Sequence, residues 1–279
     1  MKNEHAKRNK MISILLLLVL LGGLSLLLYP LVSDYWNSFH QSRAIATYVE
    51  AVAELDDASY EEWREAAQAY NTALQEDQTR FQPNEEENSA YKQLLDVSGK
   101  GIMGYLEIPC INVSLPIYHG TDEEILQIAI GHIEGSSLPV GGTGTHCVIS
   151  GHRGLPSAKL FTDLDQLTEG DLFTLRVLDE TLTYEVDQIR IVEPEDVSLL
   201  SIEAGKDLCT LMTCTPYGIN SHRLLVRGHR IENQEAAGSV RITADAIQLD
   251  PRLAAPILAA PVLLSLLLWT LFNPFNKRK

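Results

Sequence analysis

The chain has 279 residues, of which 45% are hydrophobic, and its formal net charge at pH 7 is −15. Proteins bind nucleic acid through lysine and arginine side chains that neutralise phosphates, so this acidic balance argues against nucleic acid as a partner. It suits a soluble surface or basic substrates instead. Once both ends are set aside, the chain has room for one large domain or two small ones.

The N-terminal end predicts a membrane helix. Residues 1–10 contain four basic residues and one acid, and Ile12 to Leu28 then run without a charged side chain. Extended to residue 33, this segment is long enough to cross a hydrocarbon core of roughly 30 Å. Basic residues before the span and acids after it place residues 1–10 in the cytoplasm and predict a transmembrane helix over 11–33. The alternative is a cleaved signal peptide, but its apolar region is only about 7–15 residues long, and no small-x-small cleavage site is present.

Residues 34–98 are predicted to form a helical arm. Apolar side chains recur there at helical spacing, and Asp57 to Ser59 are the expected break between two helices. Residues 82–88 combine a proline with a run of acids, which predicts a loop that serves either as a lid or as a solvated linker.

Residues 99–233 predict a mainly β domain. Short segments rich in Ile, Val, Leu and Thr alternate there with Gly, Pro, Asp and Asn. Helical pieces are expected near 121–130 and 155–167. Strands are expected over 103–108, 111–117, 145–149, 172–177, 182–192, 208–213 and 223–231. A closed or nearly closed barrel suits this number of strands, because closure leaves no exposed edge.

The C-terminal end repeats the N-terminal pattern in reverse. Residues 234–250 are polar and predict a connector, and Leu253 to Phe275 are uncharged before the basic end Lys277–Lys279. This pattern predicts a second transmembrane helix over 251–275 and a cytoplasmic tail over 276–279, so that the middle of the chain lies outside the cell. A buried helix of a soluble domain is the alternative, but it would show a polar face, which this segment lacks.

Cys214 is the candidate nucleophile. It ends the run Thr210-Leu-Met-Thr-Cys214, and Arg223 follows nine residues later. A thiolate, not a thiol, attacks a peptide carbonyl, so a catalytic cysteine needs a base or a cationic neighbour. His152 can take the thiol proton and later return it to the leaving amine. Arg223 can stabilise the oxyanion, because a guanidinium never loses its charge.

Strand geometry supports this trio. Cys214, His152 and Arg223 each lie at the end of an expected strand, and three strand ends can meet at one mouth. Taken singly, such residues are more often a core cysteine, a structural histidine and a surface arginine, so it is the combination that favours a catalytic role. If residues 208–214 form a strand, one face carries Thr210, Met212 and Cys214, and the other carries Cys209, Leu211 and Thr213.

The segment Thr210–Cys214, with an arginine nine residues on, resembles the signature of the sortases, a family of surface cysteine transpeptidases. The segments Gly151–Asp165 and Cys214–Arg230 resemble the class C branch, which polymerises pilins, and Pro116–Gly120 belongs to the same resemblance. The resemblance covers roughly residues 101–231. The N-terminal arm and the second membrane span also match this branch.

The resemblance implies a mainly β fold: an eight-stranded sortase β-barrel with short helices, preceded by the helical arm and flanked by two transmembrane helices. It implies that Cys214 attacks the Thr–Gly bond of an LPXTG-like sorting signal. His152 is then the acid and base, and Arg223 is the oxyanion-stabilising or substrate-orienting group. In class C enzymes a pilin lysine resolves the thioester, which builds covalent pili.

The expected partners follow from the same resemblance. They are LPXTG-type pilin or surface-protein substrates, an acceptor amine on a pilin lysine or a cell-wall precursor, and the membrane. No cofactor is expected. The histidines other than His152 show no metal-ligand spacing, so no metal site is expected either.

The loop from Glu193 to Gly205 matches the groove-forming loop of the family. Val197, Leu199 and Leu200 in this loop are candidate substrate-binding residues, and core or surface packing is the equal alternative for them. Thr213, beside the nucleophile, is a further candidate.

Many class C enzymes carry a lid in which an Asp-Pro-aromatic plug covers the cysteine. No Asp-Pro pair occurs before Cys214 in this chain. The nearest equivalent is Phe81-Gln82-Pro83, with the aromatic residue first, so these three residues are the candidate lid.

Other reactive residues need separate explanations. His146 is the main rival of His152 for the role of base, because a six-residue spacing puts both on one face of a strand. Cys147 and Cys209 each lie five residues before a candidate catalytic residue, and therefore on the opposite face. The resemblance makes their strands neighbours, and we favour buried thiols over a disulfide. Cys110 lies in a turn and has no assigned role.

Three other functions compete with pilin polymerisation. A papain-like or cell-wall cysteine hydrolase shares the chemistry, but those families place the cysteine before the histidine. A non-catalytic pilus-assembly factor would keep the barrel as a binding module, and the complete Cys-His-Arg set argues against it. A sortase that anchors surface proteins to the cell wall is the third, and the second membrane span favours polymerisation over it.

Overall fold

The computed structural model describes residues 2–77 and 79–233. The predicted connector 234–250, the second transmembrane helix 251–275 and the tail 276–279 lie outside the described residues. The chain divides into two units, and the second comprises Tyr35–Glu235. The described part of the first unit is residues 2–34.

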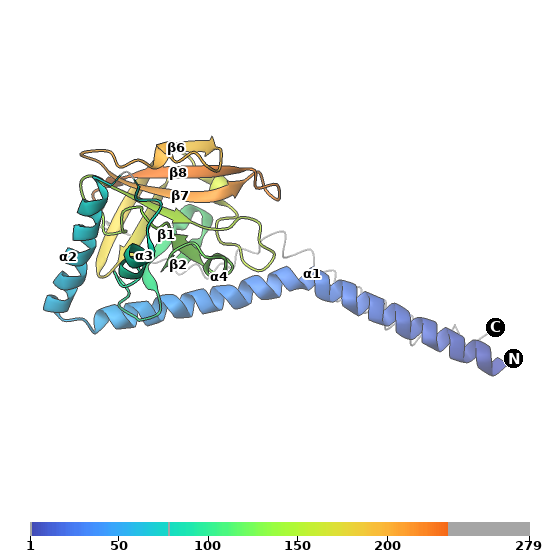
Figure 1. Ribbon diagram of the computed structural model, residues 1–279. Coiled ribbons are helices and arrows are strands. Elements are labelled where there is room, and N and C mark those ends of the chain that lie inside the picture. The colour runs from blue at the N-terminus through green and yellow to red at the C-terminus, as the bar shows by residue number, and fades with distance from the viewer. Residues whose placement is uncertain (1, 78, 234–279) are drawn as a thin grey trace. The chain divides into compact units, whose positions relative to one another are not determined.

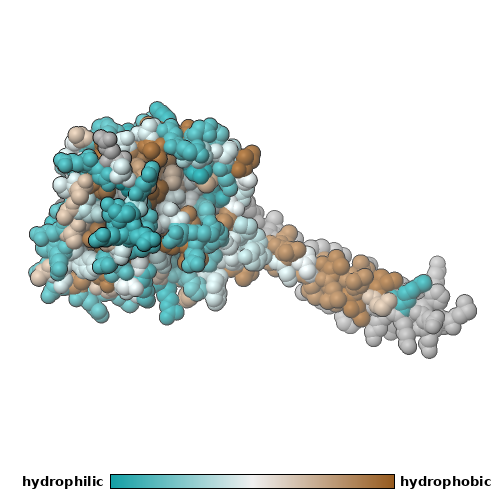
Figure 2. Space-filling view, viewed as in Figure 1, coloured by the Kyte–Doolittle hydropathy of each residue, from teal (hydrophilic) through white to brown (hydrophobic). Residues whose placement is uncertain are grey.

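The first unit is helical. Helix α1 spans Lys2–Ala53, so it contains the predicted membrane helix over 11–33 and continues beyond it. Among the described residues, one segment, Met11–Ala53, is a helix long and apolar enough to cross a membrane. Leucines and valines such as Leu16, Leu18 and Val19 are exposed along it, and Figure 2 shows them as a brown surface. This helix is compatible with a membrane anchor.

The arm consists of the end of α1, helix α2 (Asp57–Leu74) and helix α3 (Glu85–Tyr91). Asp56 caps α2 by accepting a hydrogen bond from the Ser59 amide at 2.8 Å, so the break between helices lies close to its predicted position. The loop predicted over 82–88 is wrong in part. Asn84 and Glu87 form a reciprocal capping box that starts α3 within the acidic run.

Helices α2 and α3 lie beside the β domain (Figure 1), and buried hydrogen bonds fix the arm to it. The Tyr48 hydroxyl donates to the Met103 carbonyl at 3.1 Å and accepts from the Leu178 amide at 2.7 Å. The Asn71 side chain exchanges two hydrogen bonds with the backbone of Leu138. Because buried polar groups are costly without partners, these matched pairs specify where the helices pack.

Eight strands form a closed barrel in the order β1-β2-β3-β4-β7-β8-β6-β5, which confirms the predicted fold class. The strands are β1 (Ile102–Ile108), β2 (Val113–His119), β3 (Ile130–His132), β4 (Thr145–Ser150), β5 (Leu172–Val177), β6 (Glu180–Val192), β7 (Asp207–Thr215) and β8 (His222–Ile231). All seven predicted strands are present. The sequence pattern missed β3, whose three residues are too short to show a period.

The helical predictions inside the barrel domain were less accurate. The piece expected near 121–130 shortens to α4 (Glu123–Leu126). The helix expected over 155–167 is wrong, because only the 3₁₀ turn η2 (Leu164–Gln166) forms there. The core contains four apolar side chains from successive turns of this segment: Ala158, Leu160, Phe161 and Leu164. Their spacing in the sequence resembles that of a helix, although the backbone is not α-helical. Leu160 has a φ of 39°, which is incompatible with an α-helix.

Candidate active site

Cys214 and Arg223 are paired across β7 and β8, and His152 lies two residues beyond the end of β4, the strand on the other side of β7. We call these three residues the row. The parallel strands β4 and β7 pair in register up to Ser150 opposite Met212, and the Gly151 amide continues the ladder by donating to the Met212 carbonyl at 3.0 Å. Continued by two residues past the end of β4, this register brings His152 level with Cys214. On the other side of β7, Cys214 pairs directly with Arg223 of β8. The structure therefore places the three predicted residues at the same end of three neighbouring strands.

Side chains along β7 alternate as predicted. Cys209, Leu211 and Thr213 are buried on the inner face, whereas Met212 and Cys214 are half-buried on the outer face. The parity of the strand therefore separates the candidate nucleophile Cys214 from the core cysteine Cys209.

Close packing sets the position of His152. A Cβ atom at Gly151 would lie 2.7 Å from the Phe161 ring and 2.8 Å from Ile130, so only glycine fits immediately before His152. The His152 carbonyl accepts a hydrogen bond from the Phe161 amide at 3.1 Å. The imidazole is 27% exposed, and its Nε2 lies 3.7 Å from the Glu123 carboxylate. Because the His152 imidazole is partly exposed, it can exchange protons with both a thiol and a bound substrate.

The segment after His152 is held against the end of β7. Arg153 forms an ion pair with Asp165, and its Nη1 donates to the Thr215 hydroxyl at 3.4 Å. The ring of Tyr217 packs against Gly154, whose φ is 77°. These contacts link the histidine segment to the loop that joins β7 and β8.

Arg223 has a charge that no acid compensates. Its Nη1 donates to the carbonyls of His222 at 3.2 Å and Asn220 at 3.4 Å. Among the described residues no carboxylate lies within ion-pair distance of this guanidinium. A half-buried guanidinium with only neutral partners is suited to an anion such as a developing oxyanion.

A surface groove of about 320 Å³ reaches the row at Arg223, and we call it the outer groove. Met212, Leu225 and Val192 form its floor, and Val197 and Leu200 of the β6–β7 loop form a wall. Two of the predicted substrate-binding residues therefore line it. Leu199 packs in the same apolar cluster but does not line the groove.

Thr213 does not face the outer groove, so its prediction as a substrate-binding residue needs correction. Its side chain is 1% exposed on the inner face, and its hydroxyl donates to the Gly151 carbonyl at 2.7 Å. The alternation of the strand points Thr213 away from the groove and toward the backbone that carries His152.

The candidate lid segment lies against the outer groove. Phe81 and Pro83 line the groove, whereas Gln82 is exposed. Arg80, which the sequence pattern did not single out, donates from Nη2 to the Leu200 carbonyl at 2.8 Å, and its guanidinium lies 4.5 Å from the centre of the Phe81 ring. The segment is thus fastened to the β6–β7 loop beside the row.

His146, the rival base, is buried away from the row. Its Nδ1 is 2.8 Å from the Ser201 carbonyl, and its Nε2 is 2.8 Å from the Thr210 hydroxyl. Burial lowers the pKa of His146 to about 4, and the charges of Arg227 and Arg80 add to this effect. His146 therefore ties the β6–β7 loop to β7 as a neutral imidazole.

Cys147 and Cys209 are register partners in the β4–β7 ladder, as expected, and both are buried free thiols. Burial opposes ionisation of Cys147, but hydrogen bonds from Cys209 and His132 outweigh it and lower the pKa of Cys147 to about 6. Burial raises the pKa of Cys209. Cys110 is exposed in the 3₁₀ turn η1 (Pro109–Ile111). Within residues 2–77 and 79–233, no group of three or more ligand-type side chains could hold a metal ion.

The row therefore combines a nucleophile, a titratable imidazole and a fixed cation beside a partly apolar groove. These are the groups that acyl transfer through a thioester requires. Comparison with known proteins agrees with this arrangement. The sortase domain family matches residues 106–231.

Three relatives show how far the similarity extends. Sortase C1 from Streptococcus agalactiae has a solved structure that is 51% identical, with a TM-score of 0.67, and the match covers 68% of this chain and 99% of that one. Sortase C from Streptococcus pneumoniae is 48% identical with a TM-score of 0.62, and the match covers 68% of this chain and 97% of that one. Sortase D of Bacillus subtilis (strain 168) is 34% identical over 131 residues, which are 46% of this chain and 63% of that protein. The barrel fold, the family match and the class C structural relatives together show that this chain belongs to the sortase family of cysteine transpeptidases, in its class C branch.

Proposed function

We propose that this protein is a membrane-anchored transpeptidase that cleaves an LPXTG-like sorting signal and joins it to a lysine amine of a pilin subunit. The observation that carries this proposal is the row, in which Cys214 and Arg223 pair across β7 and β8 and His152 lies just beyond the end of the neighbouring strand β4. His152 and Cys214 are 62 positions apart in the sequence. They come into one row because β4, which His152 follows, is the neighbour of β7 in the barrel.

In the first half of the reaction, the Cys214 sulfur attacks the carbonyl carbon of the Thr–Gly bond. The carbonyl oxygen becomes an oxyanion beside the Arg223 guanidinium, whose charge has no competing carboxylate among the described residues. The C–N bond then breaks, and His152 gives its proton to the leaving glycine amine. The product is an acyl thioester on Cys214.

In the second half, a neutral lysine amine attacks the thioester carbonyl. His152 takes the proton that the amine loses, the C–S bond breaks, and Cys214 is released as the isopeptide bond forms. The similarity to the pneumococcal sortase C, whose structure addresses pilin substrate specificity, supports a pilin as the acceptor. Anchoring to a cell-wall precursor amine is the second candidate for the same chemistry.

The outer groove is the proposed site of the sorting signal. Val197, Leu200 and Leu225 offer apolar surface for the leucine and proline of the signal, and the groove leads to Arg223. Phe81 and Pro83 occupy one side of this groove, so we also propose that the segment is a lid that must move before the signal binds.

We place the barrel outside the cell, with α1 as the anchor. The basic residues at the N-terminus and the apolar helix that follows support this orientation. The predicted second span over 251–275 would keep both termini in the cytoplasm.

The decisive experiment uses the full-length protein in detergent micelles. It is incubated with an LPXTG-type peptide and candidate pilins, and products are identified by mass spectrometry. A Cys214 thioester followed by Lys-linked pilin products is expected. Water as the only acceptor would indicate a hydrolase, and a Cys214→Ala protein that still supports polymer assembly would indicate a non-catalytic assembly factor.

A further inference from the structure

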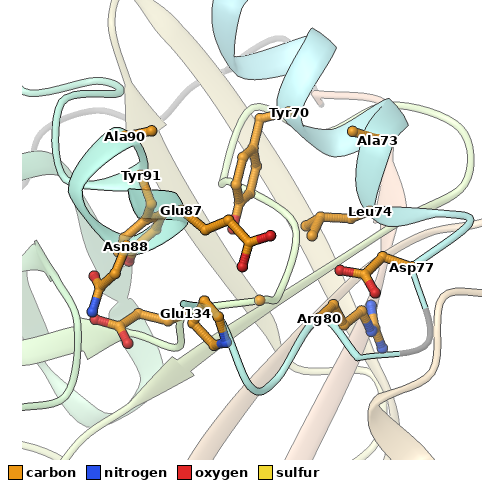
Figure 3. A pocket seen from close by; sticks show the side chains of 12 residues that line it. Tyr70, Ala73, Leu74, Asp77, Arg80, Glu87, Asn88, Ala90, Tyr91 and Glu134 are labelled. Atoms are coloured by element: carbon orange, nitrogen blue, oxygen red, sulfur yellow. The ribbon is translucent and has the colours of Figure 1, made fainter. Parts of the chain in front are cut away.

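A second cavity, of about 240 Å³, lies behind the candidate lid segment, and we call it the rear cavity (Figure 3). It is enclosed by the end of α2, by α3 and by the turn that follows β3. Pro83 and Glu134 line both the rear cavity and the outer groove. Arg80 lines the rear cavity, and the next residue, Phe81, lines the groove, so this segment is the partition between the two.

The rear cavity contains an arginine without a counter-ion. Arg80 uses Nη2 for the Leu200 carbonyl, but its buried Nη1 has no hydrogen-bond partner among the described residues. No carboxylate of residues 2–77 or 79–233 lies within ion-pair distance of this guanidinium. Burial also lowers the pKa of Arg80, and the charge of Asp77 opposes this effect only in part. An anionic group bound at Nη1 would supply what is missing.

The opposite side of the rear cavity is rich in acceptors. The buried Oδ1 of Asn88 has no donor among the described residues. Glu87 and Glu134 also line this cavity, and Figure 3 shows Glu134 beside Asn88 and the Glu87 carboxylate beside the Tyr70 ring. One oxygen of Glu87 accepts from the Asn84 amide in the capping box, and the other is unused by that cap. Acceptors in this number recognise an ammonium group.

Between these two sides the wall is mostly apolar. The ring of Tyr70 lies between the Asn88 side and the Arg80 side in Figure 3, Leu74 and Ala73 lie above Arg80, and Asp77 lies next to Arg80. Arg80 can bind a carboxylate and Asp77 can bind an ammonium group next to it, and an α-amino acid carries these two groups side by side. With three acids and one base in the lining, a ligand of net positive charge fits best.

We propose that the rear cavity binds a free basic amino acid of the lysine class. Its carboxylate pairs with Arg80, its α-ammonium with Asp77, and its side-chain ammonium with Asn88, Glu87 and Glu134. The aliphatic part lies against Leu74 and Tyr70. The cavity volume of about 240 Å³ equals the volume of about eight water molecules at roughly 30 Å³ each. This space accommodates lysine, which has about ten non-hydrogen atoms.

Occupancy of this site stabilises the lid segment. A ligand on Arg80 holds the residue that also bonds to Leu200 and lies over Phe81. Any ligand that binds one conformation better than another shifts the equilibrium toward it. A bound amino acid therefore favours the position in which Phe81 lies in the outer groove and slows access to Cys214.

The test is isothermal titration calorimetry on full-length protein in detergent micelles, without any sorting peptide. L-Lysine is compared with cadaverine, which lacks the carboxylate, and with L-norleucine, which lacks the side-chain ammonium. L-Lysine is expected to bind at least about tenfold more tightly than either, since each analogue loses one charge-assisted contact. No binding of L-lysine, or equal binding of all three, would overturn the proposal.

A change of specificity sharpens the test. Asn88→Leu removes one of the three proposed acceptors at similar volume, so the preference for L-lysine over L-norleucine is expected to fall severalfold in this variant. Glu86→Gln is the matched control, because Glu86 lies on the exposed side of α3 and does not line the cavity. A control that changes the preference as much as Asn88→Leu does contradicts the assignment.

The effect on the lid has its own readout. In a Cys110→Ser background, which removes an exposed thiol, L-lysine is expected to slow maleimide labelling of Cys214 severalfold in the parent chain but not in Asn88→Leu. Unchanged labelling in the parent chain at saturating L-lysine contradicts the coupling. Neither readout requires transpeptidation, so the proposal can fail or succeed independently of the proposed function.

Discussion

The two faces of strand β7 differ sharply although they share one backbone. The outer face carries Met212 and Cys214, which are half-buried beside a groove, whereas the inner face carries Cys209 and Thr213, which are sealed in the barrel. A β-strand has a period of two, so a shift of one residue separates chemistry from packing. Cysteine, the same residue type, is therefore a nucleophile candidate at 214 and a core side chain at 209.

Cys214→Ala is expected to have the largest effect among the variants that test this difference between the two faces. Removing the nucleophile should lower thioester formation by at least about 10³-fold while the melting temperature stays nearly unchanged. Cys209→Ala should do the opposite, with acylation retained and stability lowered by roughly 1–2 kcal/mol through lost packing. Peptide-cleavage kinetics and thermal melts measure both. If the two variants lose activity equally, the separation of the faces is wrong.

Arg223→Lys tests the outer-face row. A lysine keeps the charge but loses the planar fork of donors, and a fall of about 10²-fold in kcat/KM for thioester formation is expected. Arg190→Lys is the control, because Arg190 is exposed on β6 and, within residues 2–77 and 79–233, donates only to the carbonyl of Ile189. Similar losses in both variants would show that Arg223 has no special role in the row.

Thr213→Val tests how the inner face supports the outer one. The substitution keeps the shape but removes the hydrogen bond to the Gly151 carbonyl, which lies directly before His152. A fall of roughly tenfold in kcat with little change in KM is expected, together with a stability loss of about 1 kcal/mol. Thr213→Ser should restore kcat. A variant that loses stability but keeps its full kcat would make Thr213 purely structural.

Phe81→Ala tests the segment that covers the outer face. Removing the ring should open the groove and speed maleimide labelling of Cys214 severalfold in a Cys110→Ser background. The matched change is Gln82→Ala, since Gln82 is exposed and lines neither cavity. Equal labelling rates in the two variants would remove Phe81 from the lid.

His146→Gln concerns stability and has the smallest expected effect on catalysis. The pKa of His146 is about 4 in the folded state, against an unfolded value of about 6.5. The unfolded chain therefore binds the proton more readily than the folded chain does. The contribution of the neutral His146 to the free energy of unfolding is complete above pH 6.5 and is lost as the pH falls toward 4, by up to roughly 3 kcal/mol. Denaturant melts of His146→Gln should show a flatter pH profile than the parent chain, and His229→Gln, at a half-exposed site, should not.

Local patterns predicted much of this molecule. Short segments rich in Ile, Val, Leu and Thr, bounded by Gly, Pro, Asp and Asn, located seven strands, because β-branched residues favour strands and the bounding residues favour turns. The run from Thr210 to Cys214 and the position of Arg223 identified the candidate nucleophile and its neighbour across one hairpin. The helix wrongly predicted over 155–167 also came from a local pattern. Ala158, Leu160, Phe161 and Leu164 have helix-like spacing, but they are buried as turns under the barrel.

The sequence by itself determined the apolar N-terminal helix, the strand content and the residue types that acyl transfer requires. Only the tertiary structure decided which strands are neighbours, because a period of two specifies a face but not a partner. The level position of His152 and Cys214 depends on the register of β4 with β7, which closure of the whole barrel sets. The placement of Arg80 and Phe81 on opposite sides of one segment is likewise a result of packing, since no local pattern places two cavities around it.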